Sequence, residues 1–102
     1  MIQSIKKDIF QKEVLDSKET VIIDFNANWC GPCRMLRPIL EEVSNENPNI
    51  KIVSINVDEE KSLTKEYHVL SIPCLIFVKG GKEMKRHAGL VTKEELENLI
   101  NE

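Results

Sequence analysis

The stretch Val21-Ile22-Ile23-Asp24-Phe25 and the following Trp29-Cys30-Gly31-Pro32-Cys33 place two thiols, three residues apart, just after an apolar strand pattern. Apolar residues at helical spacing follow, including Leu36 and Leu40, so we expect the thiols at the start of a helix. Residues three apart on a helix have Cβ atoms about 5–6 Å apart, near the reach of a disulfide. Unpaired N–H groups and the helix dipole favour a thiolate on Cys30. This arrangement is typical of redox chemistry.

The size and composition predict one ordinary folded domain over residues 1–102. With 41% hydrophobic and 30% charged residues, the chain can form a core without disulfide staples. The net charge of −3 argues against a nucleic-acid partner. No apolar run approaches the roughly 18–20 residues that cross a bilayer, and the first residues do not resemble a signal peptide, so we expect no membrane partner and a cytoplasmic location. In that compartment, three cysteines are more often catalytic or metal-binding than structural.

Helix and strand patterns alternate along the chain, which predicts a layered α/β fold. We expect strands at about 2–5, 20–27, 51–57, 74–79 and 82–88. We expect helices at about 8–17, 31–47, a short segment capped by Asp58, and the segment after the capping box Thr92-Lys93-Glu94-Glu95. Gly80-Gly81 predicts a tight turn between the last two strands, and Pro38 is expected to kink its helix.

The chain resembles the thioredoxin family over essentially its whole length. Cys-x-x-Cys alone occurs in zinc sites and in redox proteins. The five-residue Trp-Cys-Gly-Pro-Cys, with an Asp six residues upstream and Ile-Pro 39 to 40 residues beyond the second Cys, is far more specific. The matching segments are Asp24-Phe25, Ala27, 29–35, Pro38, Asn56-Val57-Asp58, Ser71-Ile72-Pro73, Gly81 and Gly89. The resemblance implies a central mixed β-sheet of four or five strands flanked by four α-helices.

The resemblance also implies a protein-disulfide reductase. Cys30 is the candidate nucleophile, which would attack a disulfide in a target protein and form a mixed disulfide. Cys33, one turn inward and expected to be more buried, would then resolve that bond, while Gly31 and Pro32 stiffen the loop between the thiols. The chain carries no flavin or nicotinamide motif, so we expect no cofactor and a separate thioredoxin reductase as electron donor. The ligands left for a tetrahedral metal site are few, and we expect no metal.

Asp24 is the second informative residue because its apolar neighbours make a charge costly, which should raise its pKa. Similar proteins use this Asp, through water, as acid or base for the inner thiol, here Cys33. The alternative is a partly solvated Asp near the strand end.

Ile72-Pro73 is expected to present backbone to the target. In thioredoxins the corresponding proline is cis and lies against the cysteines. Trp29, Ile72 and Gly89 would then line a shallow apolar docking surface. Alternatively, Trp29 is a packing residue and Pro73 marks a strand start.

Several positions depart from the family pattern. Cys74 stands where thioredoxins usually carry Thr, and it is either a regulatory, redox-sensitive thiol or, as we favour, a small buried hydrophobe. Asn26 replaces a common aromatic residue, which should loosen packing, and Ser54 replaces a frequent Lys that pairs with the buried Asp. His68 and Leu70 replace a frequent Gly and a frequent Arg or Lys beside the docking surface, so partner preference is expected to differ.

The resemblance implies disulfide-containing targets such as ribonucleotide reductase, peroxiredoxin and methionine sulfoxide reductase, approached by a monomer. Two rival interpretations stay open. One is a binding module that uses the fold without catalysis. The other is a metal or iron–sulfur carrier that uses Cys30, Cys33 and Cys74.

Overall fold

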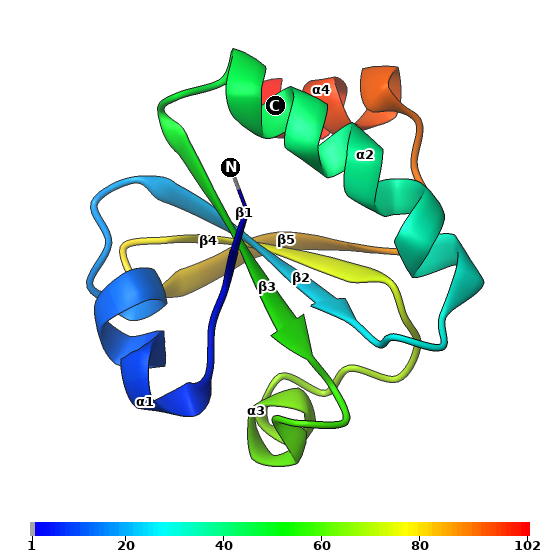
Figure 1. The fold of residues 1–102 in the computed structure, drawn as a ribbon. Helices are drawn as coiled ribbons and strands as arrows, with labels where there is room; N and C mark the ends of the chain where they lie inside the picture. The colour runs from blue at the N-terminus through cyan, green and yellow to red at the C-terminus, as the bar shows by residue number, and fades with distance from the viewer. Residues whose placement is uncertain (1) are drawn as a thin grey trace.

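A five-stranded mixed β-sheet forms the centre of the computed structural model, which describes residues 2–102 (Figure 1). The strand order is β1-β3-β2-β4-β5, with β1, β3 and β2 parallel and with β4 and β5 antiparallel to their neighbours. The strands are β1 (Ile2–Ser4), β2 (Thr20–Asn26), β3 (Ile50–Asn56), β4 (Cys74–Lys79) and β5 (Lys82–Ala88). The mixed sheet expected from the family resemblance is confirmed.

Helices cover both faces of this sheet. In Figure 1, α2 and α4 lie on one side of the sheet, and α1 and α3 lie on the other. The helices are α1 (Lys7–Phe10), its π-helical continuation η1 (Gln11–Leu15), α2 (Gly31–Glu46), α3 (Lys61–Glu66) and α4 (Lys93–Asn101). The expected helices at 8–17 and 31–47 are confirmed to within two residues at each end. None of the helices in residues 2–102 is long and apolar enough to cross a lipid bilayer.

The central strand β2 divides its side chains between two apolar clusters. Val21, Ile23 and Phe25 pack with residues of α1, η1 and α3, whereas Ile22 packs with residues of α2 and α4. Side chains alternate along a strand, so Asp24 lies on the same face as Ile22. The near-continuous apolar pattern of β2 thus reflects a strand covered on both faces, and it directs one carboxyl group towards α2.

The C-terminal part of the chain follows its local sequence signals. Gly80 and Gly81 form the turn between β4 and β5, both with positive φ angles of 60° and 78°. The capping box at the start of α4 is confirmed, because the Thr92 hydroxyl accepts a hydrogen bond from the Glu95 N–H at 3.1 Å. In return, the Glu95 carboxylate accepts one from the Thr92 N–H at 3.0 Å.

The expected capping role of Asp58 is wrong. The N-cap of α3 is Glu60, which makes no capping hydrogen bond through its side chain. The Asp58 carboxylate instead accepts a hydrogen bond from the indole of Trp29, far away in the sequence, at 2.9 Å. Asp58 therefore pairs with Trp29, a residue distant in the sequence, and does not cap the neighbouring helix α3. α2 includes Pro38 without ending there, and the kink at Pro38 stays a prediction.

We predict that Thr92→Ala lowers the free energy of unfolding by about 1 kcal/mol, because two N–H groups at the start of α4 lose their capping arrangement. Thr92→Ser keeps the accepting hydroxyl and should retain most of the stability. Urea denaturation of the three proteins measures the difference. Equal midpoints for Thr92→Ala and wild type would contradict the prediction.

Candidate active site

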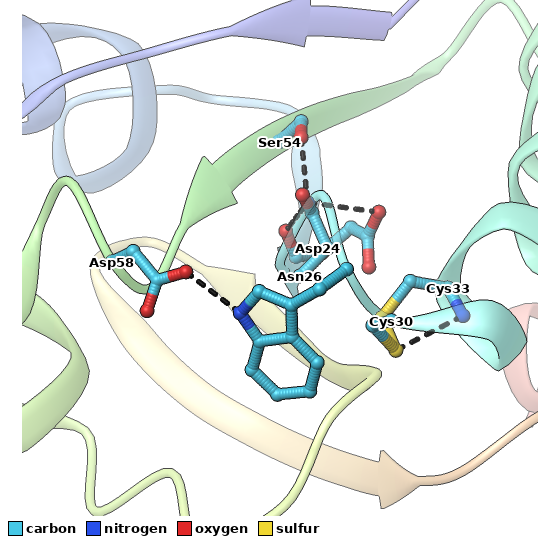
Figure 2. The surroundings of a disulfide bond; sticks show 7 residues. Asp24, Asn26, Cys30, Cys33, Ser54 and Asp58 are labelled. Carbon is cyan, nitrogen blue, oxygen red and sulfur yellow. Dashed lines mark hydrogen bonds between the residues drawn. A yellow bond between two sulfur atoms is a disulfide. The ribbon is translucent and has the colours of Figure 1, made fainter.

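The cysteine pair closes the first turn of α2. Cys30 and Cys33 form a disulfide, with their Cα atoms 5.3 Å apart. Cys30 is the N-cap residue of the helix, and its Sγ accepts a hydrogen bond from the Cys33 N–H at 3.2 Å (Figure 2). Pro32 fits the first turn because the N–H that it lacks has no partner within the helix there. Once the disulfide opens, the same N–H groups and the helix dipole favour a thiolate on Cys30.

Burial does not distinguish the two cysteines. Cys30 is 4% exposed and Cys33 is 7% exposed, so the expectation that Cys33 is the more buried of the two is wrong for this disulfide form. The reason is that Cys30 is enclosed in the same small apolar cluster as Cys33, with Ala27 as a member and with Val57 and Ile72 packed against it. What distinguishes the two residues is their position in the helix and the groups that they face.

Cys33 faces a buried acid. Asp24 is 2% exposed, which argues against the partly solvated alternative, and it lines a pocket of about 220 Å³ together with Cys33. Burial raises the pKa of Asp24 from 3.8 to about 6, while the charge of Arg37 and a hydrogen bond from Asn26 act in the opposite direction. The expected rise is confirmed. Near neutral pH this carboxyl group can therefore both take up and release a proton.

Asn26 and Ser54, two positions that depart from the family pattern, meet beside this acid. The Asn26 amide N–H₂ donates to Oδ2 of Asp24 at 3.3 Å and to the hydroxyl of Ser54 at 2.7 Å (Figure 2). It also donates to the backbone carbonyl of Asp24 at 2.9 Å. Asn26 thus takes part in the polar surroundings of Asp24, a role that its sequence position alone did not suggest.

Trp29 lies at the surface next to the cysteine pair. The residue is 68% exposed, which does not fit a packing role, and its indole N–H donates to Asp58. Sequence reasoning missed Asp58 as a site residue, although it belongs to one of the segments that match the family. The hydrogen bond to its carboxylate restrains the orientation of the exposed indole ring.

The loop before β4 lies against the same cluster. The Ile72-Pro73 peptide bond is cis, as the resemblance implied, and Ile72 packs against the cysteine cluster. The carbonyl of Pro73 accepts a hydrogen bond from the N–H of Gly89 at 2.8 Å, and Gly89 adopts a φ of 98° that favours glycine. Within residues 2–102, the backbone N–H and C=O of Ile72 form no hydrogen bond.

A shallow groove of about 180 Å³ continues from this loop. Trp29, Leu70 and Ile72 are among its lining residues, and Leu70 is 97% exposed. His68 lines the adjoining groove and has a φ of 53°, uncommon for a residue other than glycine. Trp29 and Ile72, two of the residues expected to form the docking surface, therefore line one groove. Gly89, the third, is connected to this loop by its hydrogen bond to the carbonyl of Pro73.

Cys74 is separated from this chemistry. It is 3% exposed and belongs to the apolar cluster of Phe25 and Ile76, on the sheet face opposite α2. Burial raises the pKa of its thiol, so little thiolate forms near neutral pH. These features support a packing role. In the part of the chain that the structure describes, no three His, Cys, Asp or Glu side chains are grouped so that they could hold a metal ion.

A mixed sheet that carries a Cys-x-x-Cys disulfide at a helix N-terminus, beside a cis-proline loop, defines a thiol–disulfide oxidoreductase. A sequence model of the family described as Thioredoxin matches residues 1–102. "Thioredoxin" from Chlamydia pneumoniae is 46% identical over 101 residues, 99% of this chain and 97% of that protein. "Thioredoxin" from Rickettsia felis is 39% identical over 102 residues, again 99% and 97%.

The similarity extends to plants, since "Thioredoxin H-type 1" from Nicotiana tabacum is 39% identical over 89 residues, 87% of this chain and 70% of that protein. The chain belongs to the thioredoxin family and acts as a protein disulfide reductase. Its partners are, in general, a reductase that supplies electrons and proteins that contain disulfides.

Asp24→Asn should stabilise the fold at high pH. Because the pKa of Asp24 is about 6 in the folded state and 3.8 is its ordinary value, the folded state loses stability relative to the unfolded chain as pH rises through this range. The loss is complete above about pH 7 and amounts to roughly 3 kcal/mol. We therefore expect Asp24→Asn to unfold at higher urea concentration than wild type at pH 8, with the gain shrinking as the pH falls below about 7.

Asp8→Asn is the control, because Asp8 is exposed in the first turn of α1. It should change stability little and show no comparable dependence on pH. A stability difference for Asp24→Asn that stays constant from pH 5 to pH 8 would contradict the raised pKa.

Cys74→Ala tests the packing role of the third thiol. We expect the rate of protein disulfide reduction to stay within about twofold of wild type, while the free energy of unfolding falls by about 1 kcal/mol through the lost buried atom. After mild peroxide, mass mapping of the wild-type protein should find Cys74 unmodified. Oxidised or disulfide-linked Cys74 would support the regulatory interpretation instead.

Proposed function

We propose that Cys30 is the attacking thiolate and Cys33 the resolving thiol of a general protein disulfide reductase. The observation that carries the assignment is the position of Cys30 at the N-cap of α2, with its Sγ on the N–H of Cys33. The Cys30 thiolate attacks one sulfur of the target disulfide, and the other target sulfur leaves as a thiolate. Cys33 then attacks Sγ of Cys30, which releases the second target thiol. Two electrons pass to the target, and the Cys30–Cys33 disulfide forms.

Asp24 moves the proton of the resolving step. Cys33 must lose its proton before it attacks, and Asp24 is the buried acid that lines the same pocket. A carboxyl group with a pKa of about 6 is mostly ionised near pH 7, so it can accept that proton through water. When electrons return to the disulfide, the same group gives the proton back. Gly31 and Pro32 support the pair by keeping the connecting loop short and stiff.

The target docks on the surface formed by Trp29, Ile72 and Gly89. Its extended segment pairs with the unbonded backbone of Ile72, in the manner of an added β-strand, and Pro73 keeps that backbone against the cysteines. This pairing uses main-chain groups that every protein has. It supports a reductase with broad rather than narrow target choice.

Membership of the thioredoxin family supports a proposal for the electron donor, the targets and the location of the protein. A thioredoxin reductase restores the dithiol, and the targets include ribonucleotide reductase, peroxiredoxin and methionine sulfoxide reductase. The protein works in the cytoplasm as a monomer, with residues 1–102 as a single domain and with no cofactor or metal of its own.

Cys33→Ser tests the assignment, because removal of the resolving thiol should leave target proteins attached to Cys30. We expect covalent complexes that dithiothreitol releases, seen on non-reducing gels after incubation with a disulfide-containing protein such as insulin. Cys30→Ser, with the second thiol intact, should trap at least tenfold less. Equal trapping by both variants would contradict the assigned roles.

A catalytic assay addresses the rival binding module. With dithiothreitol as electron donor, the wild-type protein should accelerate insulin reduction, and the variant that lacks both thiols should not. No acceleration by the wild-type protein would favour a fold that binds without catalysis.

A further inference from the structure

The Asn26 side chain is fixed between two buried polar groups. Asp24 of β2 and Ser54 of β3 are register partners in the parallel pair, so their side chains lie on the same face of the sheet. Asn26 follows two residues after Asp24 and therefore shares that face. Its amide nitrogen is 2.7 Å from the Ser54 hydroxyl, which is itself buried, and 3.3 Å from Oδ2 of Asp24 (Figure 2).

The amide has only two hydrogens for these contacts. The short bond to Ser54 uses one of them, and the carbonyl and Oδ2 of Asp24 share the other, at 2.9 Å and 3.3 Å. Ser54 thus fixes the rotation of the amide, and this rotation directs an N–H towards one particular oxygen of the carboxyl group. The other oxygen, Oδ1, is buried and has no hydrogen-bond partner within residues 2–102.

We propose that Asn26 is a positioning residue for Asp24, and that Ser54 holds the Asn26 amide in the required orientation. The N–H of Asn26 keeps Oδ2 as an acceptor, so the proton that Asp24 takes up resides on Oδ1. The pocket shared with Cys33 is where that proton is exchanged. The inference rests on the proposed role of Asp24 in proton transfer, and it identifies Oδ1 as the oxygen atom that carries the proton.

Within residues 2–102, the other charged and titratable groups around Asp24 donate no hydrogen bond to its carboxyl group. Arg34 and Arg37 line the pocket from α2, and Arg37 lowers the pKa of Asp24 by its charge, without a hydrogen bond to it within residues 2–102. Cys33, also from α2, forms the disulfide with Cys30 and carries no charge. The thiol of Cys74 in β4 is neutral near pH 7, because burial raises its pKa. Asn26 is the side chain that donates a hydrogen bond to the carboxyl group itself.

Asn26→Leu removes the donor while keeping a similar side-chain size. Without the N–H, ionised Asp24 loses its hydrogen bond, and we expect its pKa to rise by about one unit, a tenfold change in proton affinity. Ser54→Ala should cause a smaller rise, because the amide stays but is no longer fixed. Titration of the Asp24 carboxyl carbon by NMR in the disulfide form measures both effects.

Asn28→Leu is the matched control. Asn28 is also an asparagine that lines the pocket, but its Oδ1 accepts a hydrogen bond from the Asn56 amide, and it forms no hydrogen bond with Asp24 within residues 2–102. Its substitution should leave the pKa of Asp24 unchanged. Should Asn26→Leu not fold, Asn26→Ala takes its place, with folding judged from the amide NMR spectrum.

The rate constant for reduction of a disulfide-containing protein, measured from pH 5 to 9 with the prereduced variants, separates the two proposals. A raised Asp24 pKa, with the rate profile displaced to higher pH, supports both. An unchanged Asp24 pKa in folded Asn26→Leu overturns the role of Asn26 and leaves that of Asp24 standing. A raised pKa with an unchanged rate profile supports the positioning by Asn26 but overturns proton transfer by Asp24.

Discussion

The site depends on the short connection that places the end of the central strand β2 next to the N-terminus of α2. Because both faces of β2 are covered, Asp24 near its end lies away from solvent. A short connection later, Cys30 is the N-cap residue of α2, where the first N–H groups of a helix have no partners within it. One continuous segment thus supplies an acid with a pKa raised by burial and a thiol at a helix N-terminus, where unpaired N–H groups favour the thiolate.

The fold tolerates the buried carboxyl group at a measurable energetic cost. Roughly 3 kcal/mol at alkaline pH is a large share of the 5–15 kcal/mol that stabilises a typical domain. Two apolar clusters, one on each face of the sheet, offset this cost. The polar contacts from Asn26 and the charge of Arg37 reduce the penalty without removing it. A destabilising group in this position is better explained by chemistry than by folding, since strongly shifted pKa values concentrate at functional sites.

Structural features that depend on residues close together in the chain could be predicted from the sequence. The Gly80-Gly81 turn and the capping box at Thr92 each depend on neighbours in the chain, and both are confirmed. The raised pKa of Asp24 is also confirmed, because the apolar residues around it predict a strand that is covered on both faces. The contact between Asn26 and Ser54 could not be predicted, because it joins residues 28 apart through the β2–β3 register. The capping role given to Asp58 was wrong for the same reason. The similar burial of the two cysteines also depends on side chains contributed by distant segments.

The proposed docking surface suits a protein that must release every target it reduces. It consists of a shallow groove of about 180 Å³, an exposed indole and one unbonded stretch of main chain. A shallow groove encloses little of a bound segment, so the proposal implies weak association without the covalent bond. In the proposed mechanism, the mixed disulfide attaches the target during the reaction, and its resolution by Cys33 releases the target. Weak docking combined with a transient covalent bond lets one site serve many targets, because residence time is set by the chemistry of the thiols and not by the shape of each partner.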